Sequence, residues 1–165
     1  MSEILVGVVM GSKSDLKCVQ NTLDLLKEFN IPFEVRVLSA HRTPKETVTY
    51  AQQAYQRGIK VIIAAAGGAA ALAGIIAGVT TIPVIGIPIK TSTLNGVDSL
   101  LSIVQMPSGV PVATVAIGDA GAKNAAVLAL TILAAFQPDY QTTLVNYKES
   151  MKAKVLKDTV VDYVK

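Results

Sequence analysis

The stretch that decides the fold is "VIIAAAGGAAALAGIIAGVTTIPVIGIPI", residues 61–89, which contains no charged residue. It is long enough to cross a bilayer as a helix. Pro83, Pro88 and several glycines interrupt it, however, and its β-branched residues gather at the two ends around an alanine-rich middle. These breakers favour two buried strands joined by a helix of small residues. We therefore expect no membrane insertion.

The alternation of strand and helix extends in both directions from residues 61–89. A continuous apolar run, typical of a strand covered on both faces, occupies residues 4–10, and further strands are predicted at residues 33–38, 61–65, 84–89 and 112–117. Helical patterns lie between and after them, at residues 16–29, 43–58, 69–78, 96–104 and 120–135. Repeated strand–helix units predict an α/β fold, in which helices cover both faces of a doubly wound parallel sheet.

The second helical segment carries its own start and stop signals. "TPKE", residues 43–46, has the spacing of a capping box with proline at the first helical position. Val48, Ala51 and Tyr55 recur at helical spacing, so we expect them to face the core. Gly58 is expected to end the helix.

The 165 residues are predicted to form a single domain, with an α/β core at 1–136 and a helical extension at 138–165. Residues 139–165 hold five lysines and four acids, and their apolar residues recur at helical spacing (Leu144, Tyr147, Met151 and Val155). This helix can pack on its own domain or reach a neighbouring subunit. The composition, 51% hydrophobic and 16% charged, with a mean hydropathy of +0.47, favours the second alternative.

Charge and cysteine content exclude several classes of function. The net charge is only +3, without a basic run, so we expect no nucleic-acid partner. The single cysteine, Cys18, cannot form an internal disulfide, and no charged-then-apolar leader opens the chain. Both features favour the cytoplasm. One histidine and one cysteine provide no metal-ligand cluster, so no metal is expected.

Candidate functional residues follow the strands, because ligands bind at the carboxyl ends of strands in a parallel α/β sheet. "GSKSD", residues 11–15, offers glycine, hydroxyls and free N–H groups at a helix start, which suit an anion. The alternative is a plain helix cap in which Ser14 caps and Asp15 lies at the positive end of the helix. "AAAGGAAALAG", residues 64–74, supplies space and backbone donors for a ligand, or else serves tight packing. "KTSTLNG", residues 90–96, and "GDAGAKN", residues 118–124, follow the last two strands.

"SAHRTP", residues 39–44, contains the only histidine of the chain. His41 follows a strand and precedes a helix, so it is expected at the mouth of the sheet. Its near-neutral pKa suits proton transfer, and the planar fork of Arg42 suits a phosphate. The alternative is a capping or surface histidine beside a solvated arginine.

Taken together, five segments resemble the class I PurE family, the N5-carboxyaminoimidazole ribonucleotide mutases of purine biosynthesis. They are "VVMGSKSD", "VLSAHRTP", "AAAGGAAALAG", "LNGVDSLLSIVQMPSGVPVATVAIG" and "AGAKNAAVLALTIL", which occur in order over about the first 135 residues. The resemblance implies a three-layer flavodoxin-like fold, a homo-octamer and a reaction without cofactor. In that reaction a carboxylate moves from the exocyclic nitrogen of the ribonucleotide to ring carbon C4.

The resemblance also implies a role for each candidate residue. His41 would be the general acid/base. Ser12, Ser14 and Arg42 would hold the 5′-phosphate, with Ser39 nearby, and Asp15 would bind the ribose hydroxyls. The pocket of the aminoimidazole ring and the migrating carboxylate would be lined by Gly67, Gly68, Ala69, Ala70, Ala71 and Leu72.

One departure from the family pattern concerns this pocket. The family usually has "GGAAHLPG" where this chain has "GGAAALAG", so Ala71 replaces a histidine and Ala73 a proline. We expect a competent ribonucleotide site with reduced or altered turnover. Two alternatives remain: a sister-class enzyme that carboxylates aminoimidazole ribonucleotide directly with CO2, and a catalytically impaired ribonucleotide-binding homologue.

Overall fold

Five parallel strands form one sheet in the order β2-β1-β3-β4-β5 in a computed structural model that describes residues 3–157 and 159. The strands are β1 (Val6–Met10), β2 (Phe33–Val37), β3 (Val61–Ala66), β4 (Val84–Pro88) and β5 (Ala113–Thr114). In register, Val6 lies opposite both Phe33 and Val61, and Ala66 lies opposite Pro88. This is the flavodoxin-like strand order, so the predicted fold class is confirmed.

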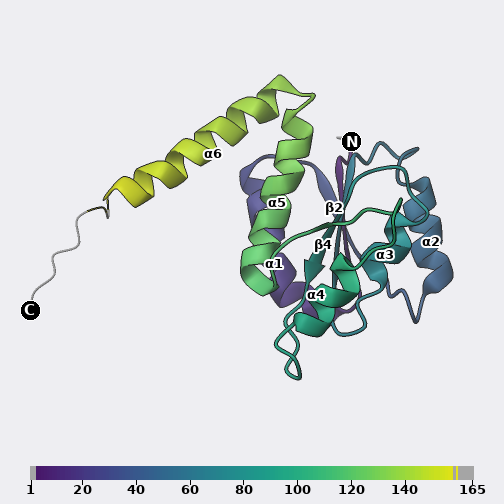
Figure 1. Cartoon of the computed structure of the whole chain (residues 1–165). Coiled ribbons are helices and arrows are strands. Elements are labelled where there is room, and N and C mark those ends of the chain that lie inside the picture. The colour runs from purple at the N-terminus through teal and green to yellow at the C-terminus, as the bar shows by residue number, and fades with distance from the viewer. Residues whose placement is uncertain (1–2, 158, 160–165) are drawn as a thin grey trace, which may run out of the picture.

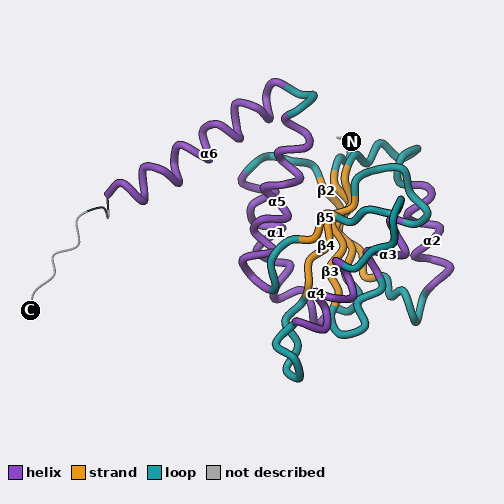
Figure 2. Tube along the Cα trace, in the orientation of Figure 1, coloured by secondary structure: helices purple, strands orange, loops and turns teal. Residues whose placement is uncertain are grey.

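Helices cover both faces of this sheet, which gives three layers (Figures 1 and 2). The helices α1 (Leu16–Glu28) and α5 (Gly118–Ala134) pack on one face. The other face is covered by α2 (Pro44–Gln53), α3 (Leu72–Ala77) and α4 (Val97–Val104). Neighbouring strand residues alternate between the two cores: Val8 and Ile63 face α1 and α5, whereas Val9 and Ile62 face the opposite helices. The central strands are therefore buried on both sides.

The fifth strand is shorter than the predicted 112–117, because only Ala113 and Thr114 pair with β4. One further bond, from the Val115 N–H to the Gly86 carbonyl at 3.1 Å, continues the ladder. The next donor on this side of β4 would be residue 88. Pro88 has no N–H, so the ladder ends there.

The start and the buried face of α2 differ from the prediction. Thr43 is the N-cap and Pro44 the first helical residue, but no capping box forms there, because the Thr43 side chain bonds Ser39 instead. Ala51 is buried as predicted and Val48 is half-buried, but Tyr55 is 65% exposed, and Thr47 and Tyr50 are buried instead. The helix ends at Gln53 and not at Gly58 as predicted. Tyr55 lies beyond this end, so the helical spacing no longer applies to it.

The helical extension predicted at residues 138–165 is α6 (Pro138–Lys157), which leaves the body of the molecule at an angle (Figure 1); residues 158 and 160–165 of that prediction lie outside the described residues. Leu144 is buried, and the Tyr147 ring meets the Phe29 ring edge-on at 5.1 Å between centroids. Farther along, Met151 and Val155 are 41% and 68% exposed. The apolar stripe of this helix therefore covers the chain's own domain only in its first half. Among the described residues, no helix is long and apolar enough to cross a membrane.

Candidate active site

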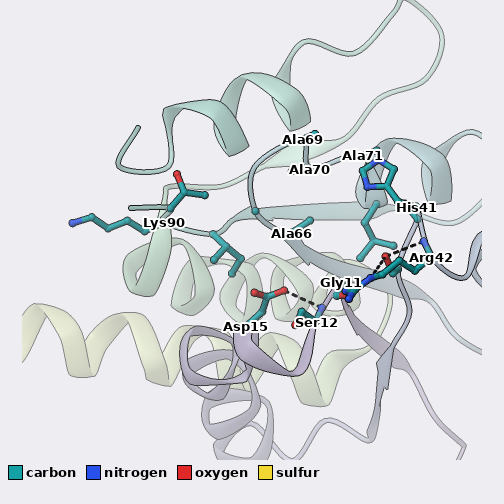
Figure 3. A pocket seen from close by; sticks show the side chains of 16 residues that line it. Gly11, Ser12, Asp15, His41, Arg42, Ala66, Ala69, Ala70, Ala71 and Lys90 are labelled. Atoms are coloured by element: carbon teal, nitrogen blue, oxygen red, sulfur yellow. Dashed lines mark hydrogen bonds between the residues drawn. The ribbon is translucent and has the colours of Figure 1, made fainter. Parts of the chain in front are cut away.

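A cavity of about 530 Å³ opens at the carboxyl edge of the sheet, where the loops after β1, β2, β3 and β4 meet (Figure 3). It collects all but two of the predicted site residues. The cavity is lined by Gly11, Ser12, Asp15, Ser39, Ala40, His41, Arg42, Ala66, Gly67, Ala69, Ala70, Ala71, Leu72, Ile89, Lys90 and Thr91. Segments from four separate parts of the sequence thus form one site.

The loop after β1 is closed by a capping box centred on Ser12. The Ser12 N–H donates to Oδ2 of Asp15 at 3.1 Å, and Oγ of Ser12 accepts the Ser14 N–H at 3.3 Å. The cap that the sequence suggested at Ser14 is therefore wrong: Ser12 caps a short 3₁₀ turn (Lys13–Asp15) that leads into α1. The Ser14 hydroxyl donates to Oγ of Ser12 at 2.8 Å, and Ser14 lines a neighbouring cavity.

Asp15 lies half-buried on the floor of the cavity. Burial raises the pKa of its carboxyl above the ordinary value, and the N–H of Ser12, the hydroxyl of Ser14 and the charge of Arg42 offset only part of this rise. The carboxylate is therefore kept at an electrostatic cost. Such a cost is typical of a group with a binding or catalytic use.

The loop after β2 is a tight turn that presents two side chains to the cavity. Oγ1 of Thr43 accepts the Ser39 N–H at 2.8 Å and donates to the Ser39 carbonyl at 3.1 Å. Arg42 extends from this turn to the first loop, where its Nη2 donates to the carbonyl of Gly11 at 3.0 Å. Its Nε donates to Oγ of Ser39 at 3.3 Å. The guanidinium is thereby fixed in place before any ligand binds.

The imidazole of His41 lies above this turn and beside Ala71 (Figure 3). No hydrogen bond joins its ring to the other residues drawn there. The methyl group of Ala71 is half-buried and lines the same cavity. The lone histidine thus lies within the crevice that the sequence predicted for it.

The loop after β3 provides a wall made almost entirely of backbone and methyl groups. Gly68 has a φ of +67°, which glycine adopts without strain, and its N–H and C=O point to α4. Gly68 is accordingly the second predicted residue that does not line the cavity. Ala70 and Leu72 line the cavity with only 2% of their surface exposed. Residues 67–72 contain no side-chain acid or base.

Sequence reasoning assigned no role to three lining residues in the loop after β4. Ile89, Lys90 and Thr91 line the cavity, and Lys90 lies on the side away from His41 (Figure 3). Their position directly after a strand marked this segment in the sequence as a candidate, but it did not show which of its residues would line the cavity. Within the part of the chain that the structure describes, no group of three or more His, Cys, Asp or Glu residues could hold a metal ion.

Comparison with known proteins connects this geometry to a family. A family model described as AIR carboxylase matches residues 5–154. The chain is 58% identical over 151 residues to the N5-carboxyaminoimidazole ribonucleotide mutase of Pyrococcus horikoshii, covering 92% of this chain and 84% of that protein. It is 55% identical over 155 residues to the mutase of Bacillus subtilis, covering 94% and 96%.

Two further similarities extend the comparison. The phosphoribosylaminoimidazole carboxylase of Schizosaccharomyces pombe is 54% identical over 92% of this chain, which matches 27% of that longer protein. The crystal structure of Treponema denticola PurE superposes with a TM-score of 0.84 at 31% identity, covering 93% of this chain and 95% of that one. Sequence and structure therefore point to one group of proteins.

Proposed function

Since the chain belongs to the AIR carboxylase family, we infer that it is an N5-carboxyaminoimidazole ribonucleotide mutase, an isomerase of purine biosynthesis. The activity expected from the sequence is the activity named for the curated mutases, which cover more than nine-tenths of this chain. The roles of individual residues are assigned because one cavity brings together His41, Arg42, Ser12 and Asp15.

The anionic end of the substrate belongs with Arg42 and the serines. The guanidinium is held by its hydrogen bonds to Gly11 and Ser39, so its charge is already positioned when the ligand binds. We assign the 5′-phosphate to Ser12, Ser14 and Arg42. Ser14 lines the neighbouring cavity, and its hydroxyl reaches this site through the hydrogen bond that it donates to Ser12.

The sugar and the base extend from this anchor towards the two remaining walls. Asp15 lies beside the anchor and is assigned to the ribose hydroxyls, whose hydrogen bonds would offset the cost of its burial. The aminoimidazole ring is assigned to the backbone and methyl wall at residues 67–72. A wall without large side chains allows a planar ring to approach closely.

His41 is assigned both proton transfers of the reaction. The bond from the exocyclic nitrogen to the carboxylate carbon breaks as the imidazolium donates a proton to that nitrogen. The CO2 released then forms a bond to C4, and the neutral imidazole removes the C4 proton, which returns the enzyme to its starting state. One base suffices because the exocyclic nitrogen is attached to the same bound ring that contains C4, and the CO2 is held beside it.

The substrate and the role of His41 are tested in one assay. Purified protein is supplied with N5-carboxyaminoimidazole ribonucleotide, and separately with aminoimidazole ribonucleotide and CO2, for wild type and His41→Asn. Turnover of the first substrate alone, lost in His41→Asn, supports the mutase. Turnover of the second supports the direct carboxylase, the activity named for the S. pombe relative. Ligand-induced thermal stabilisation without turnover, unchanged in His41→Asn, supports an impaired binding homologue.

We also propose that the chain acts as a homo-octamer in the cytoplasm. The exposed apolar residues of α4 and α6, and of the loop before α4, support assembly, since Leu94, Leu101 and Val155 are 55%, 51% and 68% exposed in the single chain. The second half of α6 is expected to pack on a neighbouring subunit. Sedimentation measures the assembly: a particle of eight chains supports this proposal, and a monomer at micromolar concentration contradicts it.

A further inference from the structure

Ser99, in α4, lies between the ends of β3 and β4 and uses its hydroxyl in both directions. The residue is completely buried. Its Oγ donates to the carbonyl of Ile89 at 2.7 Å and accepts the N–H of Gly68 at 3.0 Å. A buried hydroxyl with both functions satisfied is a fixed structural link and not a chance contact.

The position of this hydroxyl follows from the register of the two strands. Ala66 pairs with Pro88, and the Ile89 N–H donates to the Ala66 carbonyl at 2.9 Å. In a parallel ladder, alternate residues of one strand donate and accept in turn, so the next bond would run from the Gly68 N–H to the Ile89 carbonyl. Those are the two groups that Ser99 joins. Its hydroxyl therefore replaces one ladder bond and separates the two strand ends by the width of an oxygen atom.

A second serine of α4 fixes the other polar group of the same glycine. Ser102, three residues after Ser99 and thus on the same side of the helix, donates its hydroxyl to the Gly68 carbonyl at 3.1 Å. Both the N–H and the C=O of Gly68 are held, at a residue whose φ of +67° reverses the chain. The loop that starts here forms the methyl wall of the cavity. On the other strand, Ile89 lines the same cavity.

We propose that Ser99 is a positioning residue for the reaction, assisted by Ser102. By parting β3 from β4 and holding Gly68, it sets the distance between the wall at residues 67–72 and the rim at Ile89. This inference rests on the proposed function, because that wall is assigned to the ring and to the confined CO2. The phosphate anchor at Ser12 and Arg42 is built by other loops and does not depend on Ser99.

The test compares Ser99→Ala with Thr22→Val, a matched loss of a buried hydroxyl. Thr22 is also completely buried, and its Oγ1 donates to the Ala122 carbonyl at 2.7 Å between α1 and α5, outside the cavity. Ser99→Ala is expected to lower kcat roughly tenfold, while KM stays within about twofold because the phosphate anchor is intact. Thr22→Val is expected to lower the melting temperature comparably and to leave kcat unchanged.

A second measurement follows the Gly68 N–H by hydrogen exchange. Exchange at this amide is expected to be faster in Ser99→Ala than in wild type, and unchanged in Thr22→Val. If Ser99→Ala does not fold, Ser102→Ala, a change at an exposed residue, is expected to lower kcat by a smaller factor and to speed exchange at residues 68–70.

Each result bears on one proposal. A kcat that is unchanged in Ser99→Ala, or lowered equally by Thr22→Val, overturns the positioning role while the mutase assignment stands. A change confined to KM overturns it too. A wild-type protein without turnover refutes the proposed function, and the Gly68 exchange rate then still decides whether Ser99 holds the loop.

Discussion

The Asp15→Asn substitution separates the cost of a half-buried carboxylate from its use in binding substrate. Burial raises the pKa of the Asp15 carboxyl, so the folded protein disfavours its charge relative to the unfolded chain. The stability linked to this group is therefore present below the ordinary aspartate pKa and is lost as the pH rises through the raised value. Asparagine does not ionise and escapes that loss. It also keeps one oxygen to accept the Ser12 N–H, now 3.1 Å from the carboxylate.

The expected gain in stability is small, because solvent reaches this residue and screens its charge. A gain below about 1 kcal/mol corresponds to less than roughly 2–4 °C in melting temperature for a chain of this size. The ribose hydroxyls, in contrast, would lose a charged acceptor, which costs about 1.5–3 kcal/mol. Because about 1.4 kcal/mol is a factor of ten, KM is expected to rise roughly ten- to a hundredfold.

Two measurements follow these opposite effects. Thermal melts of wild type and Asp15→Asn across pH are expected to differ at pH 7 and to converge near about pH 3, where the wild-type carboxyl is also protonated. The mutase assay gives KM under the same conditions. A variant that melts lower at pH 7, with a gap that closes in acid, would refute the reasoning, since it would show that the ionised carboxylate stabilises the fold.

Three further predictions concern single residues at or near the cavity. His41→Asn is expected to lower kcat by about 10²–10⁴ with little change in melting temperature, because the side chain is exposed; mutase assays and thermal melts check both. Ala71→His, which restores the imidazole usual in the family, is expected to raise kcat, whereas unchanged rates would show that this imidazole is dispensable here. Burial and Asp119 raise the pKa of the Cys18 thiol to about 11, so its alkylation by iodoacetamide at pH 8 should be roughly a hundredfold slower than in the denatured chain, as measured by mass spectrometry.

The pattern of buried strands in the sequence was enough to predict most of the fold. Apolar runs covered on both faces are typical of central strands in a parallel sheet, so the order of elements followed from the sequence. What failed was detail that depends on partners elsewhere in the chain. Thr43 has the right spacing for a capping box, but Ser39 competes for its hydroxyl. The end of the β4–β5 ladder depends on which side of β4 the missing N–H of Pro88 faces.

In the candidate site too, residues marked by the local sequence were predicted, and those that depend on partners elsewhere in the chain were not. His41, Arg42 and Asp15 were found because each follows a strand and has reactive chemistry. Lys90 follows a strand as well, yet the sequence alone did not show on which rim of the cavity it lies. The role of Ser99 was beyond sequence reasoning, because it depends on the register of two strands and on a helix that crosses their ends.

Helix α4 has one face that contacts the cavity wall and one exposed apolar face. One face holds Gly68 through Ser99 and Ser102, while Val97, Leu101 and Val104 on the other are 47%, 51% and 47% exposed. If a second copy covers this outer face, assembly also restrains the helix that positions the wall of the cavity.

Leu101→Lys tests this connection, because a charge in an apolar contact has no partner there. We expect a smaller particle in sedimentation and a lower kcat, with turnover that recovers as the protein concentration rises. The substitution lies on an exposed position, so the melting temperature of the single chain should change little. An unchanged particle mass together with unchanged turnover would mean that the outer face of α4 stays bare in solution. A smaller particle with full turnover would mean that the serines hold Gly68 without help from a neighbouring chain.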